Sequence, residues 1–110
     1  MISVILCILE EAGIVIHSFA EKMTEDLFHG RPSTKLLKFS SSMQRAALVK
    51  LDILNAANCV LDLKSPPGNR LEALKGDLKG HYSIRINDQW RLVFRFENSN
   101  AYDVQIMDYH

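Results

Sequence analysis

Apolar side chains in the first half of the chain recur at the three- and four-residue spacing of amphipathic helices. The stretch AEKMTEDLFHG predicts a short helix that Gly30 can end. After the chain-breaking sequence RPST, Ser41 and Gln44 stand at the spacing of a capping box and predict the start of the longest helix. The apolar stripe of that helix consists of Met43, Ala47, Leu51 and Leu54.

Alternation of apolar and polar residues replaces the helical spacing after the loop SPPGN, where two prolines exclude a regular helix. We expect strands over 70–74, 81–86, 90–96 and 101–107, and a further short strand in the apolar, β-branched stretch 14–19. Helices first and strands last are typical of an α+β domain. The pattern predicts two N-terminal helices packed on one face of a mainly antiparallel sheet of four or five strands.

The alternation also predicts which side chains share a face of the sheet. A three-residue turn over 87–89 places Arg85 directly across from Arg91 and leaves the apolar side chains of both strands on the opposite face. Continued into the last strand, the same rule predicts three pairs: Phe96 with Tyr102, Phe94 with Val104, and Leu92 with Ile106.

Cations gather on the other face of the sheet, which we call the arginine face after Arg85, Arg91 and Arg95. The whole chain has 13 Lys and Arg and 13 Asp and Glu, whereas residues 64–95 hold seven cations against three acids. Two arginines directly opposite each other in a sheet cost up to about 1 kcal/mol, and a bound anion would offset that cost. The alternative is a solvated polar face that binds nothing.

The C-terminal residues add chemistry to the arginine face. Tyr109 is expected on the side of Arg91, with Asp108 and His110 next to it. Arginines suit a phosphodiester, because the guanidinium binds phosphate oxygens and stabilises the charge that develops at phosphorus. RNA supplies its own nucleophile, the 2′-OH, so the protein has only to provide a base and an acid. No cluster of metal ligands is visible in the sequence, which favours a route without a metal or other cofactor.

Cysteine usage and the N-terminal sequence bear on location. Cys7 and Cys59 lack the paired spacing of zinc or redox sites, which indicates a reducing, cytoplasmic environment. The apolar run at the N-terminus lacks a basic leader and is interrupted by Glu10 and Glu11 after about eight residues. It is too short for a membrane span and differs from a signal peptide, so we expect no membrane partner.

The stretch PPGNRLEALKGDLKGHYSIRINDQWRLVFRF, followed by the final residues DVQIMDYH, resembles the HigB branch of the RelE/ParE toxin superfamily over about residues 15–110. The resemblance implies the RelE-like fold and the toxin of a type II toxin–antitoxin pair in a bacterial cytoplasm. It implies an endoribonuclease that enters the ribosomal A site and cleaves translated mRNA without a metal, leaving a cyclic phosphate. The implied partners are a helix-turn-helix antitoxin similar to HigA, the ribosome with its mRNA, and operator DNA only through the antitoxin.

Individual site residues follow from the positions that match the family motif. By this resemblance, Lys75 and Arg91 bind and stabilise the phosphate. Asp108, Tyr109 and His110 share the roles of base, acid and positioning group. Four further cations are candidate RNA contacts, namely Arg70, Lys79, Arg85 and Arg95.

Glu72 departs from the family pattern, because some relatives have a histidine at this position, three residues before the lysine. The carboxylate can accept a proton, or the acid–base chemistry can move to His110. This departure keeps open the alternative of an inactive toxin that acts as a transcriptional co-regulator with its antitoxin. A second alternative is a toxin of the same fold directed at DNA gyrase, against which Lys75 and the terminal residues DYH argue, since gyrase-directed relatives tend to lack these groups.

Residues 1–14 have no counterpart in the resemblance and form an N-terminal extension to a toxin domain at 15–110. A GTG codon encodes valine and can initiate bacterial translation, so we expect Val15 to be the native start. Without the extension the chain loses Glu10 and Glu11 and becomes basic by two, which suits an RNA partner. A native protein whose intact mass includes residues 1–14 would contradict this expectation.

Overall fold

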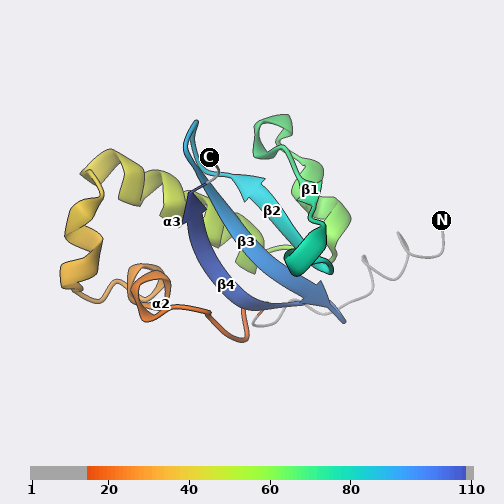
Figure 1. The fold of residues 1–110 in the computed structure, drawn as a ribbon, viewed down its shortest axis with the longest axis horizontal. Coiled ribbons are helices and arrows are strands. Elements are labelled where there is room, and N and C mark those ends of the chain that lie inside the picture. The colour runs from red at the N-terminus through yellow and green to blue at the C-terminus, as the bar shows by residue number, and fades with distance from the viewer. Residues whose placement is uncertain (1–14, 109–110) are drawn as a thin grey trace.

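An antiparallel sheet of four strands in chain order forms the centre of the fold (Figure 1). The computed structural model describes residues 15–108, so the expected extension 1–14 and the site candidates Tyr109 and His110 lie outside the described residues. The four strands expected in the second half of the chain are all present. Their bounds are β1 (Glu72–Ala73), β2 (His81–Arg85), β3 (Trp90–Glu97) and β4 (Asn100–Asp108).

The first strand, β1, is shorter than the predicted strand 70–74. Arg70 has a left-handed backbone conformation, with φ at 46°, which a strand does not accommodate. On the other side of β1, Lys75 is the N-cap of a short 3-10 helix, η4 (Gly76–Leu78). Only two residues are therefore left to pair regularly with β2.

Residues 15–19 lie along β4 without forming the predicted regular strand. Two isolated parallel bridges join them to β4, Ile16 to Ala101 and Phe19 to Val104. The ladder breaks between these bridges, where Asp103 has a positive φ of 55° and its N–H donates to Ser18 Oγ at 2.8 Å. The expected fifth strand is thus reduced to local contacts along β4.

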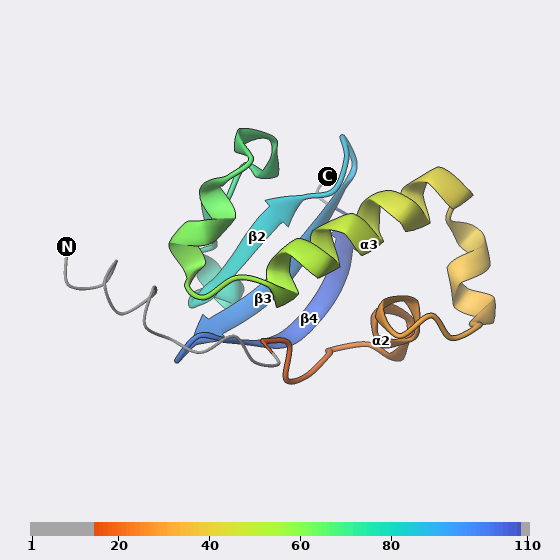
Figure 2. The same ribbon diagram turned by 180° about the vertical axis from the view of Figure 1, so that it is seen from behind.

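Helix α3 (Ser41–Asn55) crosses one face of the sheet and contacts β3 and β4, whereas the shorter α2 (Lys22–Phe28) packs against α3 and β4 (Figure 2). All four residues of the predicted apolar stripe are buried and join one core with the sheet. Burying a large apolar side chain contributes roughly 1.5–3 kcal/mol, so this face is the main source of stability. No helix within residues 15–108 is long and apolar enough to cross a membrane.

The N-terminal cap of α3 differs from the predicted capping box. Ser40, and not Ser41, is the capping residue, because its Oγ accepts a hydrogen bond from the Met43 N–H at 3.1 Å. Gln44 does not reach back to the cap. Its Nε2 donates to Leu36 O and Phe39 O at 2.9 and 3.2 Å, which fastens α3 to the preceding 3-10 helix η1 (Thr34–Lys38).

The register between β2 and β3 is confirmed. Arg85 lies directly opposite Arg91, and Ile84 lies opposite Leu92. Ile84 and Leu92 are both fully buried against α3's side of the sheet, in the same apolar core as the helix stripe. The three-residue turn over 87–89 therefore directs the arginines to the face that the helices leave uncovered.

The register between β3 and β4 is only partly as predicted. Leu92 does lie opposite Ile106, but a bulge between Val93 and Arg95 changes the rest. Tyr102 lies opposite Arg95 and not Phe96, and the regular pair expected between Phe94 and Val104 is absent from the ladder. Because β4 has one extra residue at the bulge, Tyr102 points to the opposite face of the sheet from the one predicted and lies on the arginine face.

Candidate functional site

Arg91 is the most deeply buried cation of the arginine face. Its relative exposure is 4%, and its neighbours on the same face, Ser83 and Val93, are at 1% and 4%. The alternative of a solvated polar face is therefore wrong at the centre of this face. The loop before β1 covers Arg91, because Arg70 O accepts a hydrogen bond from its Nη2, and Glu72 of β1 lies beside the guanidinium.

Four contacts fix the guanidinium of Arg91. Its Nε donates to Ser83 Oγ at 2.7 Å, and its Nη2 donates to Ser83 O at 3.3 Å and to Arg70 O. The Glu72 carboxylate lies 3.6 Å from the same Nη2. A planar guanidinium held from several directions keeps one orientation, which preorganises it for an incoming anion.

The covering loop is itself anchored by Asn69, which is fully buried. Asn69 Nδ2 donates to Leu63 O at 3.2 Å and to Ser65 O at 3.3 Å, across the 3-10 turn η3 (Pro67–Asn69). Its Oδ1 accepts a hydrogen bond of 2.5 Å from Lys50 Nζ on α3. These bonds hold the loop so that the following carbonyl, Arg70 O, reaches Arg91.

A polar pocket of about 340 Å³ opens beside Arg91. Three arginines and one carboxylate of the predicted site line it, together with two residues of the β2–β3 turn. The lining residues are Arg70, Glu72, Arg85, Asn87, Asp88 and Arg91. The structure thus brings together four of the ten candidates, from β1, β2, β3 and the loop before β1.

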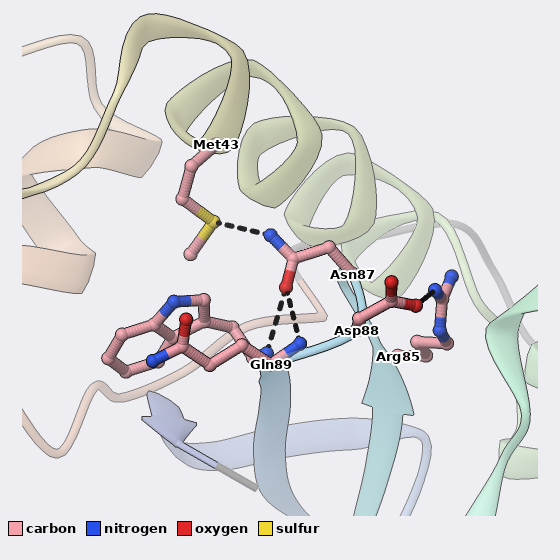
Figure 3. Close-up of polar contacts among 6 residues, drawn as sticks. Met43, Arg85, Asn87, Asp88 and Gln89 are labelled. Atoms are coloured by element: carbon pink, nitrogen blue, oxygen red, sulfur yellow. Dashed lines mark hydrogen bonds and ion pairs between the residues drawn. The ribbon is translucent and has the colours of Figure 1, made fainter.

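The β2–β3 turn, shown in Figure 3, contributes Asn87 and Asp88 to the lining of this pocket. Asn87 Oδ1 accepts from the backbone N–H groups of Gln89 and Trp90 at 2.9 Å each, and Asn87 Nδ2 donates to the sulfur of Met43 on α3 at 3.5 Å. Asp88 forms an ion pair with Arg85. The turn is therefore rigid where it meets α3, and its exposed carboxylate neutralises one pocket arginine.

Protein carboxylates thus offset the like-charged pair that Arg85 and Arg91 form across the sheet. Asp88 pairs with Arg85, and Glu72 lies beside Arg91. An anion is not required to relieve the repulsion. An RNA phosphate in this pocket would instead compete with Asp88, whose side chain is 99% exposed and moves aside at little cost.

Lys50 is a neighbour of the pocket that the sequence did not reveal. It lies on α3 one position before the buried Leu51 and reaches Asn69 behind the loop. Burial, followed by the nearby charge of Arg85, lowers the pKa of Lys50 from its ordinary value. The sequence signal that could have identified Lys50 is its position directly before a residue of the apolar helix stripe.

Arg95 lies on the same face but away from the pocket. Its Nε donates to Asp103 at 3.0 Å and its Nη1 to Glu97 at 3.0 Å, and these hydrogen bonds, Asp103 first, raise the pKa of Arg95. The guanidinium also lies 5.0 Å from the centre of the Tyr102 ring. With two carboxylate partners, Arg95 is already neutralised within the fold.

The structure does not bring Lys75 and Lys79 to the pocket. Both are exposed and flank η4, which follows β1. The Leu74 N–H donates to His81 O, so this segment lies beside the start of β2, whereas Arg85 ends that strand. The two ends of β2 are about 13 Å apart at 3.3 Å per residue.

Asp108 lies near the β2–β3 turn but not on the arginine face. It is opposite Trp90, and its Oδ2 accepts a hydrogen bond from Gln89 Nε2 at 3.0 Å. Since Trp90 shares a side of β3 with Leu92, Asp108 projects toward the helix side of the sheet. The expected carboxylate therefore stands at the end of the sheet that also carries the pocket.

This arrangement can bind and polarise a phosphodiester. Arg91 is fixed, Arg85 forms an exposed ion pair with Asp88, and the Glu72 carboxylate beside Arg91 is the candidate proton acceptor in the same pocket. Within residues 15–108, no group of three or more His, Cys, Asp and Glu side chains could hold a metal ion.

Most of the chain is similar in sequence to known proteins. The family model described as the RelE-like toxin HigB of type II toxin–antitoxin systems matches residues 17–110. The chain belongs to the HigB-like toxins. This toxin is 42% identical over 83 residues to Toxin HigB-1 of Vibrio cholerae, a match that covers 76% of the chain and 85% of that protein.

A further relative of this HigB-like toxin is Endoribonuclease HigB of Proteus vulgaris, 44% identical over 41 residues, which are 37% of the chain and 45% of that protein. Among solved structures, the YoeB dimer of Staphylococcus aureus has a TM-score of 0.57 at 22% identity and covers 88% of this chain and 97% of YoeB. The YoeB–YefM complex of that organism has a TM-score of 0.51 at 18% identity, covering 90% and 99%. These two structures are similar to the toxin in fold.

Proposed function

We propose that this HigB-like toxin is an endoribonuclease that cleaves mRNA on the ribosome and is neutralised by an antitoxin similar to HigA. The observation that carries the proposal is the pocket in which Arg91, held by Ser83 and Arg70 O, lies beside Arg85 and Glu72. Membership of the HigB-like family supports it, and so does the name of the Proteus vulgaris relative.

In the proposed reaction the scissile phosphate lies between Arg85 and Arg91. The 2′-oxygen attacks the adjacent phosphorus while its proton passes to a base, and the bond from phosphorus to the 5′-oxygen breaks. The leaving 5′-oxygen takes a proton from an acid, giving a 2′,3′-cyclic phosphate and a 5′-hydroxyl. Arg91 stabilises the negative charge that builds up on the phosphate oxygens as the phosphorus becomes five-coordinate.

Glu72 is our proposed base, since it is the carboxylate that lines the pocket beside Arg91. Asp108 ends β4 at the same end of the sheet, and Tyr109 and His110 come next in the sequence. We assign these three residues the acid and positioning roles. Lys75, Lys79 and Arg70 would contact the RNA on either side of the cleaved bond. Arg95 would add least, because two carboxylates already bind it.

The proposed partners follow from the family and from the similarity in fold to YoeB. A type II toxin has a cognate antitoxin, and YoeB, similar in fold, has been solved in complex with YefM. We propose a helix-turn-helix antitoxin, through which the toxin reaches operator DNA, and cytoplasmic ribosomes as the site of action. The functional domain is 15–110, with Val15 as its first residue.

The test is cleavage of a defined mRNA by the purified domain, with and without programmed ribosomes, with the cut ends mapped by primer extension. We expect cuts only with ribosomes. Arg91→Lys keeps the charge but loses the planar fork, so cleavage should fall roughly 100-fold or more. His110→Ala should also abolish it. Lys64→Ala, on the exposed η2 (Val60–Lys64), is the control and should cut normally.

Intact mRNA in both reactions would overturn the proposal. Inhibition of DNA supercoiling by the same preparation would then identify a gyrase-directed toxin. Operator binding with the antitoxin, without any effect on RNA or supercoiling, would identify an inactive co-regulator.

A further inference from the structure

Lys50 occupies an unfavourable position for a cation. It lies on α3 directly before the fully buried Leu51, and its Nζ donates to Asn69 Oδ1 in the loop before β1, at 2.5 Å. Burial, and then the charge of Arg85, lower the pKa of Lys50, so its surroundings disfavour the ammonium. Among the ion pairs of residues 15–108, none includes Lys50, and a long side chain held in one place loses conformational entropy. We therefore expect this contact to fix a geometry more than to stabilise the fold.

The partner of Lys50 is a fully buried amide. Asn69 uses both ends of its side chain: Nδ2 donates to Leu63 O at 3.2 Å and to Ser65 O at 3.3 Å, and Oδ1 accepts from Lys50. Because an ammonium donates hydrogen bonds and never accepts them, Lys50 determines which end of the amide faces α3. Without this donor, Asn69 Oδ1 would be a buried acceptor that has lost its hydrogen bond, and the amide could turn.

The backbone of the next residue, Arg70, depends on this anchor. It is left-handed, with φ at 46° and ψ at 57°. Residues other than glycine rarely adopt this conformation, and it persists only where the surrounding contacts impose it. Asn69 holds the chain directly before Arg70, and Arg70 O accepts from Arg91 Nη2. If Asn69 is released, the backbone of Arg70 can relax, and its carbonyl then turns away from Arg91.

Arg91 is held both by β2 and by the loop before β1. Ser83 on β2 accepts from Arg91 Nε through Oγ at 2.7 Å, and Nη2 donates to both Ser83 O and Arg70 O. A guanidinium held by two segments keeps its plane, and this plane decides whether the fork can bind two oxygens of a phosphate. The loop therefore contributes to the orientation of Arg91, and Lys50 contributes to the position of the loop.

We propose that Lys50 positions Arg91 for the cleavage reaction, acting through Asn69 and the Arg70 carbonyl. Lys50 is not among the residues that line the polar pocket, so a phosphate bound there would not touch it. The inference rests on the proposed function in taking a phosphate of RNA as the group that Arg91 binds. Helix α3, whose apolar stripe stabilises the fold, thus also carries a residue that orients the pocket.

The first test separates kcat from KM for mRNA cleavage on programmed ribosomes. Lys50→Met removes the ammonium but keeps an unbranched side chain, and a misplaced Arg91 should lower kcat by roughly 10- to 100-fold. KM should stay close to the parent value, because Lys50 lies outside the pocket lining. Lys50→Arg keeps a cationic donor and should restore most of kcat. Lys64→Met, which removes an exposed lysine of η2, is the control and should match the parent in both constants.

The second test needs no RNA. The Nε–H of Arg91 is buried and bonded to Ser83, so it should exchange slowly with solvent, as measured by nitrogen NMR of the arginine side chains. Arg91→Lys identifies the signal by its loss. In Lys50→Met the exchange should be roughly tenfold faster or more, because the loop opens more often. The backbone N–H of the fully buried Leu92 reports unfolding of the whole domain, and its exchange should change much less.

Unchanged exchange of the Arg91 Nε–H in Lys50→Met would overturn the inference, and so would faster exchange with kcat at the parent value. An equal fall of kcat in Lys64→Met would also overturn it, because loss of positive charge alone would then explain the effect. If the parent protein cuts no mRNA, the exchange measurement still decides the structural link. Faster exchange in Lys50→Met would then uphold the positioning of Arg91 by Lys50 and refute only the proposed function.

Discussion

The two faces of β3 are almost equally buried but are covered in different ways. On one face Leu92 and Phe94 are fully buried in an apolar core with α3. On the other, Arg91 and Val93 are each only 4% exposed, and Val93 does not belong to the apolar core. There the loop before β1 covers Arg91, through a hydrogen bond from the guanidinium to Arg70 O. Alternation along a strand tells which face a residue takes, but not what lies over it.

This difference predicts different consequences for stability and for function. Apolar burial is non-directional and scales with area, so the helix-covered face should govern the free energy of unfolding. Hydrogen bonds orient groups but contribute only about 0.5–1.5 kcal/mol each. The loop-covered face should therefore govern the position of Arg91 more than the stability of the fold.

The largest effect is expected from Leu92→Ala. The side chain is fully buried between the sheet and α3, so its loss should lower the free energy of unfolding by about 2–5 kcal/mol, measured by urea denaturation. Against a typical domain stability of about 5–15 kcal/mol, this is a severe destabilisation.

Val93→Ala is the matched variant on the opposite face of the same strand. Removing two methyl groups should cost about 1.6 kcal/mol at 0.8 kcal/mol per buried carbon group. If Val93→Ala destabilises the protein as much as Leu92→Ala, the two faces contribute alike to stability and the comparison fails.

Much of the fold follows from the sequence, because its signals are local. The strands, the apolar stripe of α3 and the register of Arg85 opposite Arg91 all depend on periodicity and on the length of one turn. The bulge in β4 could not be predicted, since it depends on Asp103 bonding to Ser18, 85 residues away. The cap of α3 is Ser40 and not the predicted Ser41, because the sequence alone does not show which of two adjacent serines caps the helix.

The site was predictable in its residue types but not in its geometry. The sequence identifies the arginines, but the burial of Arg91 depends on a loop that Asn69 and Lys50 fasten from 19 residues apart. Lys75 matches the family motif, yet it lies at the far end of β2 from Arg85.

An intermediate effect is expected from Ser83→Ala, which tests the loop-covered face directly. The change removes the hydroxyl that accepts from Arg91 Nε and leaves that buried N–H without its partner. The expected loss of stability is about 1–3 kcal/mol. mRNA cleavage should fall by more than the loss of stability alone would cause, since Arg91 can then rotate away from the phosphate.

Ser83→Thr keeps a hydroxyl at the same position and serves as the control, with cleavage restored toward that of the parent protein. Measuring kcat separately from KM distinguishes positioning from binding. A Ser83→Ala toxin that is destabilised but cleaves at the parent rate would show that the orientation of Arg91 does not matter for the reaction.

The smallest effect on stability is expected from Asp88→Asn, which should at the same time strengthen RNA binding. Its side chain is 99% exposed and pairs with Arg85, so the free energy of unfolding should change by no more than about 0.5–1 kcal/mol. Removing the carboxylate leaves Arg85 available to a phosphate, and RNA should bind more tightly, with a salt slope steeper by up to about 0.9. Asp52→Asn, an exposed residue of α3 outside the pocket, should change neither quantity. Unchanged RNA binding in Asp88→Asn would mean that Arg85 is not a phosphate contact, which would leave Arg91 and Arg70 as the pocket's cations for RNA.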